Sequence, residues 1–334
     1  MKDVARHAGV SQSTVSRVLN DVEGPVRIAP ETRDRVHEVV RELGYRPNPL
    51  ARGLRGARMS MIGLLVREVA DPFFAAMIEA LSAELRARRY SVLLGHARSQ
   101  AEDAMELTGV LETRHCDGIL LLGDLHDQQL LTRELVPRQL PVLALCVGRR
   151  AVDIPAVNSD NALGTQLALR HLAELGHRRI ACIDAGWLGD VAERRERYAS
   201  FLRERSLAAP PGYVQPAENS TRGGYAALSR LFELAEPPTA VFASTDVLAL
   251  GALKAAADAS LRIPADVSVV GFDDISFAEA ASPALTTVRQ PVREMARVAV
   301  DSLLAVVDDP AAELPNLRRL HPRLVVRGST GPPG

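Results

Sequence analysis

A short segment near the N-terminus carries side chains that could read the edges of DNA bases. The run DVARHAGVSQSTVSRVLN, residues 3–20, predicts two short helices, with Gly9 in the turn between them because a positive φ is cheap only for glycine. Ser11 can cap a second helix that begins at Gln12. Hydrogen-bonding side chains in the first turn of that helix, with Arg17 one turn later, suit a major groove. A small helical hairpin with a polar surface is the alternative.

Apolar residues at helical spacing would hold this helix pair together, and Ala5 is small where two helices cross closely. These apolar residues are Val4, Val10, Val15, Val18 and Leu19. The side chains left on the outside of the second helix are Gln12, Ser13, Thr14, Ser16 and Arg17.

Charge is unevenly divided along the chain. The 334 residues are 47% hydrophobic and 24% charged, with a formal net charge of −1, which predicts a globular protein of two or three folding units. Residues 1–58 hold 11 Lys and Arg against 7 Asp and Glu, whereas the remainder holds 29 against 34. A basic head on an acidic body indicates that only the N-terminal segment meets a polyanion.

The body lacks the sequence motifs of catalysis. It contains no GxxxxGK[ST], no GxGxxG after a strand, no HExxH and no GxSxG. Asp184 and the pair Asp273–Asp274 could be imagined as acid/base or metal-binding groups, but carboxylates at strand ends are more often ligand contacts or helix caps. No enzymatic activity, cofactor or metal is therefore expected.

Cysteine usage and hydropathy point to a cytosolic protein. Cys116, Cys146 and Cys182 lie far apart with no CxxC pair, which disfavours a disulfide framework or a zinc site. The N-terminus has no signal-peptide run, and no apolar stretch approaches the ~20 residues of a membrane span.

Short apolar runs alternate with amphipathic segments from Met61 onward. Examples are MIGLLV, SVLLGHA, GILLLG and PVLALC, with the helical pattern FFAAMIEALSAELRARR between the first two. The alternation resumes after Asp160, and together the two units predict two α/β lobes with parallel sheets. Ligands of such folds bind beyond the carboxyl ends of the strands, so residues directly after each apolar run are the candidates for a site.

The ordered motifs resemble the LacI/GalR family of bacterial repressors over essentially the whole chain. They run from the N-terminal segment through APETRDRV, ELGYRPNPLARGLR, DPFF, CDGILLL, HLAELGHRRIA, TDVLALGAL and VGFDD to LVVRGST. The resemblance implies an α/β fold with an N-terminal helix-turn-helix head and a two-lobed, periplasmic-binding-protein-like body with parallel sheets. The implied parts are a head at 1–46, a hinge helix or linker at 47–58 and a body at 59–334.

Within the body, the resemblance implies that the chain crosses between the lobes, with Pro291 marking a return to the first lobe. Lobe one would hold about 59–159 and 291–317, and lobe two about 160–290 and 318–330. The segment VREMARVAVDSLLAVV would then complete lobe one as a helix.

The resemblance assigns roles in DNA binding to residues of the head. Gln12, Ser13 and Arg17 match base-reading positions, and arginine can pair bidentately with guanine. Positions that match phosphate contacts or helix caps are Ser11, Thr14, Ser16 and Asn20. The segment at 21–28 is longer than the family's usual turn.

Residues 49–56 resemble the family's hinge helix, which forms on DNA. Leu54 matches the residue that wedges into the minor groove, with Ala51 beside it and Arg52 and Arg55 on phosphates. Gly53 replaces the commoner serine, which should make this helix more dependent on DNA. A plain flexible linker is the alternative.

The resemblance also assigns effector-binding residues to the body. Phe73 would line the cleft while Phe74 packs, and Arg197, three residues before Ser200–Phe201, would bind the effector. The effector-binding set is Phe73, Phe74, Arg197, Thr245, Asp246 and Asp273. Arg194 and Arg195 have no match and are expected in solvent.

Other predicted cleft residues either depart from the family's pattern or have no role that the resemblance assigns. Cys146–Val147 and Asn219 stand where a polar pair and an aromatic residue are common, so the effector could differ from those of well-known members. His96 and Arg98 are possible extra contacts, whereas His171 and His177 are expected to be structural.

The predicted function is a dimeric transcription repressor that binds a pseudo-palindromic operator and a small effector, most often a carbohydrate in this family. A nucleobase or nucleoside acting as corepressor is the alternative. A solute-binding protein would share the body but lack the basic head. With only GPPG after LVVRGST, no tetramer-forming helix is expected.

Overall fold

The computed structural model describes residues 1–19, 28–45, 59–97, 101–113, 116–125, 140–148, 154–186, 189–207, 210–312 and 316–334. The chain divides into two compact units, Met1–Met59 and Ser60–Gly334. The first unit is called the head and the second the body. Each is described on its own.

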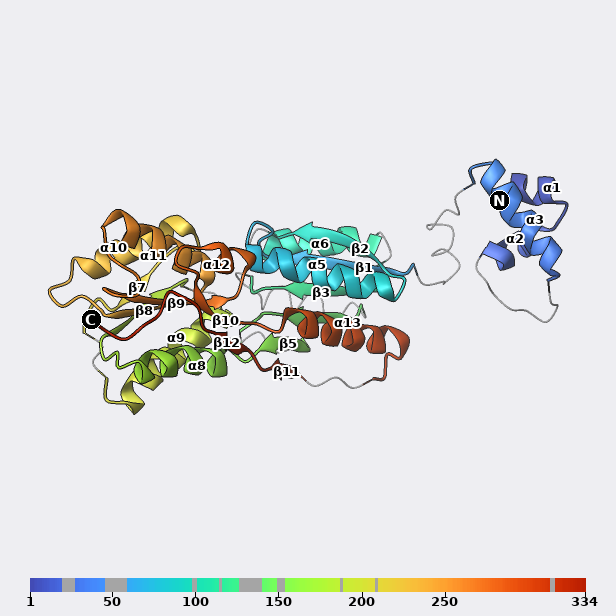
Figure 1. Ribbon diagram of the computed structural model, residues 1–334. Helices are drawn as coiled ribbons and strands as arrows, with labels where there is room; N and C mark the ends of the chain where they lie inside the picture. Colours follow the sequence, from blue (N-terminus) through green and yellow to red (C-terminus); the bar gives the residue numbers. More distant parts are fainter. Residues whose placement is uncertain are drawn as a thin grey trace. The chain divides into compact units, whose positions relative to one another are not determined.

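The head contains helices α1 (Lys2–Ala8), α2 (Gln12–Leu19) and α3 (Pro30–Glu42) (Figure 1). Helix α1 ends at Gly9, whose φ of 63° lets its N–H reach the carbonyls of Ala5 and Arg6. Ser11 Oγ accepts a hydrogen bond of 3.1 Å from Thr14 N and so caps α2. The predicted helix, glycine turn and capped second helix are all present.

A valine-rich core joins the three helices of the head. It is formed by Val4, Ala5, Ala8, Val15, Val18, Val36 and Val39, with Val10 and Leu19 packed against it. Because the apolar face of α1 and the apolar face of α2 both pack in this core, the polar face of each helix points outward. The apolar pairing expected from the spacing is confirmed.

The first lobe of the body is built on a parallel sheet with the strand order β11-β5-β4-β3-β1-β2. Its strands are β1 (Met61–Val66), β2 (Ser91–His96), β3 (Gly118–Leu122), β4 (Val142–Leu145), β5 (Ala156–Ser159) and β11 (Leu317–Leu320). Its helices are α5 (Pro72–Ala87), α6 (Ala101–Thr113) and α13 (Val292–Asp308).

Alternate residues of β1 reach the two faces of this sheet. Ile62, Leu64 and Val66 join the core under α5 and α13, whereas Leu65 joins the core under α6. Both faces are therefore buried, which is why the strand reads as a continuous apolar run.

The second lobe repeats this plan with the strand order β12-β10-β9-β8-β6-β7. Its strands are β6 (Ile180–Asp184), β7 (Val214–Pro216), β8 (Ala240–Ala243), β9 (Ser268–Asp273), β10 (Thr286–Arg289) and β12 (Arg323–Val325). Strand β12 pairs antiparallel with β10, and the other pairings are parallel. The expectation of parallel sheets thus holds except at this edge.

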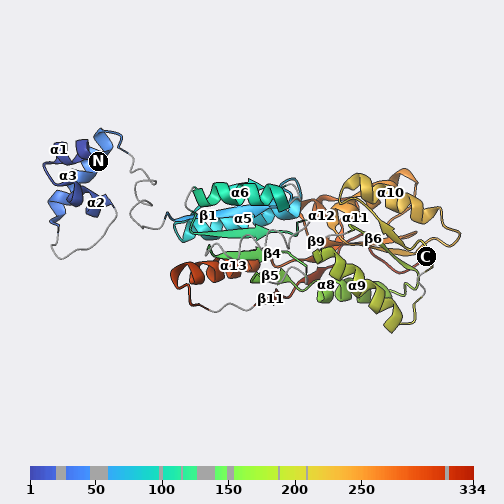
Figure 2. The same cartoon turned by 180° about the vertical axis from the view of Figure 1, so that it is seen from behind.

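Helices cover both faces of the second sheet. They are α8 (Asn161–Glu174), α9 (Gly189–Glu204), α10 (Thr221–Phe232), α11 (Asp246–Asp258) and α12 (Ser276–Ala280). Helices α8 and α9 lie on one side and α10 and α11 on the other, as both views show (Figures 1 and 2).

The chain passes between the lobes after β5, after β10 and after β11. The second crossing lies at Pro291, directly before α13, where a return to the first lobe was expected. Strand β11 pairs with β5 through Leu320, so the first sheet extends three residues past the expected boundary at 317. In the part of the chain described, no helix is long and apolar enough to cross a membrane.

Candidate DNA-reading helix and interlobe cleft

Helix α2 presents the predicted base-reading side chains on its outer face. Gln12 and Ser13 are exposed in its first turn, and Arg17 lies in its last turn, partly buried. Exposed polar side chains at the N-terminus of a helix that packs on a three-helix core are what base-edge contacts in a major groove require.

The predicted phosphate-contacting and capping residues lie around the same helix. The hydroxyl of Ser11 contacts Ser13 Oγ at 2.7 Å and Thr14 Oγ1 at 2.8 Å, so these three hydroxyls form one cluster at the helix start. Ser16 is partly buried on α2. Several assigned residues lie outside the described part of the chain: Asn20, Ala51, Arg52, Leu54, Arg55 and Arg98.

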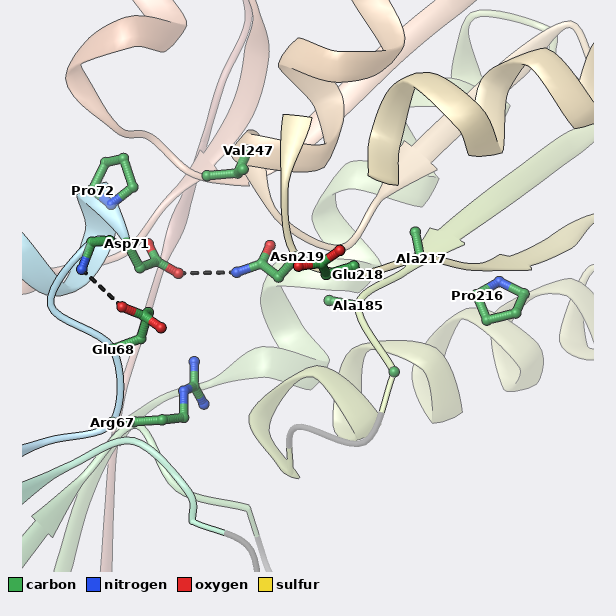
Figure 3. Close-up of a pocket in the computed structure, with 12 residues that line it drawn as sticks. Arg67, Glu68, Asp71, Pro72, Ala185, Pro216, Ala217, Glu218, Asn219 and Val247 are labelled. Carbon is green, nitrogen blue, oxygen red and sulfur yellow. Dashed lines mark hydrogen bonds between the residues drawn. The ribbon is translucent and has the colours of Figure 1, made fainter. Parts of the chain in front are cut away.

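A cavity of about 670 Å³ lies where the carboxyl ends of β1, β6 and β7 come together (Figure 3). The first lobe contributes the segment after β1, and the second lobe contributes the segments after β6 and β7 with the start of α11. The lining residues are Arg67, Glu68, Ala70, Asp71, Pro72, Ala185, Gly186, Pro216, Ala217, Glu218, Asn219 and Val247. The site thus lies at the strand ends, where the α/β pattern predicted it.

A hydrogen-bonded chain joins the two lobes at this cavity. Asn219 Nδ2 of the second lobe donates to Asp71 Oδ2 of the first at 3.0 Å, and Thr245 Oγ1 donates to Asn219 Oδ1 at 2.7 Å. Burial raises the pKa of Asp71. Asn219, which stands where an aromatic residue was expected, therefore links the lobes through polar contacts.

Arg194, which was expected in solvent, is buried inside the second lobe and is absent from the described lining of the cavity. Its side chain is 2% exposed, and its guanidinium lies 3.7 Å from the ring centre of Phe272. Nε donates to Asn161 Oδ1 at 2.9 Å and Nη1 to the Ser244 carbonyl at 2.5 Å. Nη1 also lies 3.4 Å from Asp273 Oδ1, and Nη2 lies 3.4 Å from Asp190 Oδ2.

Arg197, the expected effector-binding arginine, makes different contacts. Its Nη1 lies 2.6 Å from Glu204 Oε1, and it also donates to Ser200 Oγ at 3.0 Å. Glu204 is 56% exposed, so this pair lies at the outer side of α9. The buried arginine of α9 is instead Arg194, which stands four residues before Tyr198 just as Arg197 stands four residues before Phe201.

The helical face of α9 distinguishes the two arginines. Val191, Arg194, Tyr198 and Phe201 are all buried, at helical spacing, whereas Arg195 is 45% exposed and pairs with Asp184 at 2.9 Å. Reading α9 as an amphipathic helix would therefore have identified Arg194. The expectation of a solvated residue was wrong for Arg194 and only partly right for Arg195.

Asp273, the predicted effector-binding carboxylate, lies buried at the end of β9 and is not among the residues that line the described cavity. Its Oδ1 accepts a hydrogen bond of 2.7 Å from Gln290 Nε2 and lies 3.4 Å from Arg194 Nη1. Burial raises its pKa well above the ordinary value, although Arg194 opposes this.

Asp246 has a structural position and not one at the cavity. It is fully buried, with Oδ1 accepting from Thr287 Oγ1 at 2.5 Å and Oδ2 from Ile275 N at 2.9 Å. Burial raises its pKa to about 7. These bonds fasten the start of α11 to β10 and to the segment after β9, so both oxygens are already engaged within the second lobe.

The two phenylalanines pack in the core of the first lobe. Phe73 is 5% and Phe74 1% exposed, and in the described part of the cavity wall neither ring is present. Pro72 begins α5 directly after the Asp71 cap, which turns both rings into the core under that helix. The expectation that Phe73 lines the cleft is therefore not met, whereas Phe74 packs in the core as expected. The guanidinium of Arg67 lies 4.5 Å from the centre of the Phe74 ring.

Asp124, at the carboxyl end of β3, receives backbone donors from both lobes. Gly148 N of the first lobe donates to Oδ1 and Oδ2 at 3.0 and 2.9 Å, and the Gly189 amide of the second lobe also donates. A Cβ on Gly189 would lie 2.7 Å from Gly148 Cα, so only glycines permit this approach. Burial and the nearby Asp190 raise the pKa of Asp124 to about 6.

The histidines and cysteines take mainly structural places. His177 is fully buried and contacts Thr239 Oγ1 at 3.0 Å, and His171 contacts Thr330 Oγ1 at 2.9 Å. His96 lies 3.8 Å from Oε1 of Glu68, which lines the cavity. All three cysteines are buried and unpaired, and burial raises their pKa values.

Comparison with known proteins agrees with this arrangement of parts. Residues 1–48 match the family described as bacterial regulatory proteins, lacI family, and residues 169–330 match the periplasmic binding protein-like domain. The chain is 33% identical to the HTH-type transcriptional repressor CytR of Escherichia coli (strain K12), over 99% of this chain and 96% of CytR. The chain belongs to the lacI family. It is a transcription regulator of this family and not an enzyme.

Solved structures of the lacI family extend the likeness across both units. The Lac repressor dimer bound to operator and the anti-inducer ONPF superposes with a TM-score of 0.89 at 28% identity, covering 98% of each chain. The transcriptional regulator CelR in complex with cellobiose gives a TM-score of 0.74 at 32% identity, again covering 98% of each chain.

Proposed function

We propose that this lacI-family protein is a homodimeric repressor that acts in the cytoplasm. Each head reads one half-site of a pseudo-palindromic operator through Gln12, Ser13 and Arg17 on α2. The supporting observation is the exposure of Gln12 and Ser13 at the start of a capped helix that packs on a three-helix apolar core. The similar Lac repressor binds its operator as a dimer.

In this proposal the hinge at 47–58 completes the DNA contact. Leu54, with Ala51 beside it, wedges into the minor groove, while Arg52 and Arg55 neutralise phosphates. Unstacking a base step costs a few kcal/mol, which the contacts of the bent duplex offset.

The interlobe cavity binds the effector, with Asp273 and Arg194 behind it. A carbohydrate is the first candidate, because oxygen and nitrogen donors and acceptors line the described cavity wall and no aromatic ring offers a stacking face. The related CelR carries cellobiose. A nucleobase or nucleoside is the second candidate.

Effector and operator affect each other through closure of the lobes. Such coupling typically amounts to about 1–3 kcal/mol, and linkage requires it to be reciprocal. Contacts that exist only between the lobes, such as Asp71 with Asn219, are where an effector would change the balance.

Selection of full-length protein against a random duplex pool tests the DNA-binding proposal. The expected result is enrichment of an inverted repeat, bound with an affinity that falls steeply as salt rises. Sedimentation of the complex should give two chains per duplex. A pool that shows no sequence enrichment, or a single unpaired half-site, would contradict the proposal.

A further inference from the structure

A carboxyl group of the first lobe is bound by main-chain amides from both lobes. Asp124 lies beyond the carboxyl end of β3, and Gly148 N donates to its Oδ1 and Oδ2 at 3.0 and 2.9 Å. Its second main-chain donor is the amide of Gly189, the first residue of α9 in the second lobe. Because one donor comes from each lobe, the complete set of bonds exists only while the lobes are in contact.

The main chains of the two lobes approach each other very closely at this carboxyl group. A Cβ built on Gly148 would lie 2.6 Å from Gly189 Cα, and one built on Gly189 would lie 2.6 Å from Asp124 Oδ2. Asp124 is 6% exposed in this arrangement. Water therefore has little access to its carboxyl group, and separation of the lobes would expose it.

The charged groups around Asp124 come from both lobes. Those that act on it in the described structure are Arg67, after β1, and Asp190, in the first turn of α9, whose side chains are 6% and 9% exposed. Asp190 Oδ2 in turn lies 3.4 Å from Arg194 Nη2, and Arg194 Nη1 lies 3.4 Å from Asp273 Oδ1.

Negative charge exceeds positive charge in this network. Its described members are two guanidinium groups and four carboxyl groups, which belong to Arg67, Arg194, Asp71, Asp124, Asp190 and Asp273. Arginine keeps its charge at any ordinary pH, so within this network only a proton bound by a carboxyl group can reduce the excess. Burial makes an uncompensated charge costly, and the cost disappears when the lobes separate and water returns.

We propose that Asp124 is a proton-dependent latch between the lobes, whose carboxylic acid form keeps the lobes in contact and whose carboxylate form favours their separation. Burial and the neighbouring Asp190 raise the pKa of Asp124 to about 6 while the lobes are in contact, and its ordinary value is 3.8. The arrangement in contact therefore binds the proton more tightly. Its population is greatest below pH 4 and falls as the pH rises through 6.

The latch would make the regulator respond to pH. With these two pKa values, one proton makes the ratio of lobes in contact to separated lobes about tenfold larger at pH 5 than at pH 7.5. This consequence for DNA binding rests on the proposed function, in which the arrangement of the lobes is coupled to operator affinity. Any such coupling then carries the same dependence on pH.

Distances between spin labels on the two lobes test the latch in the full-length protein. Glu106→Cys on α6 and Arg222→Cys on α10 place the labels at exposed positions, whereas the three native cysteines are buried. Singly labelled proteins identify distances that arise between subunits. From pH 5 to pH 7.5 we expect the ratio of the short-distance to the long-distance population to fall about tenfold in the wild type.

Matched variants test whether Asp124 is the group responsible. Asp124→Asn keeps the side-chain volume without the charge, so its distance distribution should be the same at both pH values. Asp184→Asn removes a buried carboxylate at the end of β6 that pairs with Arg195 of its own lobe at 2.9 Å, and it should keep the wild-type response. Identical distributions at the two pH values in the wild type, or a wild-type response in Asp124→Asn, would overturn the latch.

Operator affinity at the same two pH values separates the latch from the proposed function. Titration of groups in the head is common to the wild type and Asp124→Asn, so it cancels when their two pH profiles are compared. We expect the profiles to differ by up to about tenfold. Identical profiles beside a pH-dependent distance would contradict the coupling and leave the latch standing, whereas operator selection beside a pH-independent distance would overturn the latch alone.

Discussion

Replacing Arg194 by methionine, with Arg197→Met as the control on the same helix, separates an arginine buried in the second lobe from one on the outer side of α9. Methionine approximates the aliphatic part of arginine and removes only the guanidinium. In Arg194→Met, Asp273 and Asp190 each lose a cationic neighbour at 3.4 Å, and Asn161 Oδ1 and the Ser244 carbonyl lose their donors.

The expected loss follows from burial. Removing one partner of a buried ion pair costs about 3–5 kcal/mol, because the remaining charge stays buried without compensation. At 1.4 kcal/mol per factor of ten, this corresponds to roughly a hundredfold to a few thousandfold in the unfolding equilibrium. Arg197→Met should change stability little, because Glu204 is 56% exposed and water can replace its partner.

Urea unfolding of full-length wild type and both variants measures this difference at one pH and salt concentration. Two probes, far-UV circular dichroism and fluorescence, check whether the body unfolds in one step. The expected order is a much lower midpoint for Arg194→Met and a wild-type midpoint for Arg197→Met. Equal midpoints for the two variants would refute the assignment of Arg194 to a buried network of ion pairs and hydrogen bonds.

Three further predictions concern contacts between the lobes. The pKa of Asp124 is raised from 3.8 to about 6, so the folded protein keeps a proton that the unfolded chain releases, and stability falls as pH rises from 4 to 6. Asp124→Asn should therefore be up to about 3 kcal/mol more stable than wild type at pH 7.5 and equally stable at pH 4, as measured by thermal unfolding. The same stability difference at both pH values would show that protonation of Asp124 is not its cause. Gly189→Ala should lose about 1–3 kcal/mol, because its Cβ would lie 2.6 Å from Asp124 Oδ2, and unchanged unfolding would show that the lobes need not approach this closely. Asn219→Ala should lose about 1–2 kcal/mol, because Asp71 Oδ2 loses its donor and the Thr245 hydroxyl loses its acceptor, and calorimetry showing no loss would contradict the interlobe bridge.

The architecture was predictable because local patterns determine it. Short apolar runs such as MIGLLV form strands that are buried on both faces, and the glycine turn and serine cap define the helix pair of the head. These features depend on residues close in sequence. The resemblance to the lacI family then supplied the order of the crossings between lobes.

The cleft was only partly predictable, because its contacts depend on how distant elements meet. Asp273 and Thr245 could be placed at strand ends. The family match selected Arg197, whereas the buried arginine is Arg194, because burial depends on which face of α9 packs inward. Phe73 follows a strand end directly, yet the turn into α5 directs it to the core.

Three residues between the lobes were not singled out from the sequence. Arg67, Asp124 and Asp190 lie next to element ends, and their contacts across the lobes, Arg67 with Asp190 and Asp124 with the Gly189 amide, join residues far apart in the chain. A list of every polar residue that directly follows a strand would have contained Arg67 and Asp124 among many other candidates. The interlobe partners themselves come only from the tertiary structure.

Operator affinity of Arg17→Ala tests the central claim most directly. Fluorescence anisotropy would measure the dissociation constants of wild-type and variant protein for the selected operator and for a scrambled duplex at the same salt concentration. Loss of one base-reading contact should weaken operator binding by about 1–3 kcal/mol, roughly 5- to 150-fold, with little change on the scrambled duplex. Unchanged operator binding in a folded Arg17→Ala protein would contradict the account.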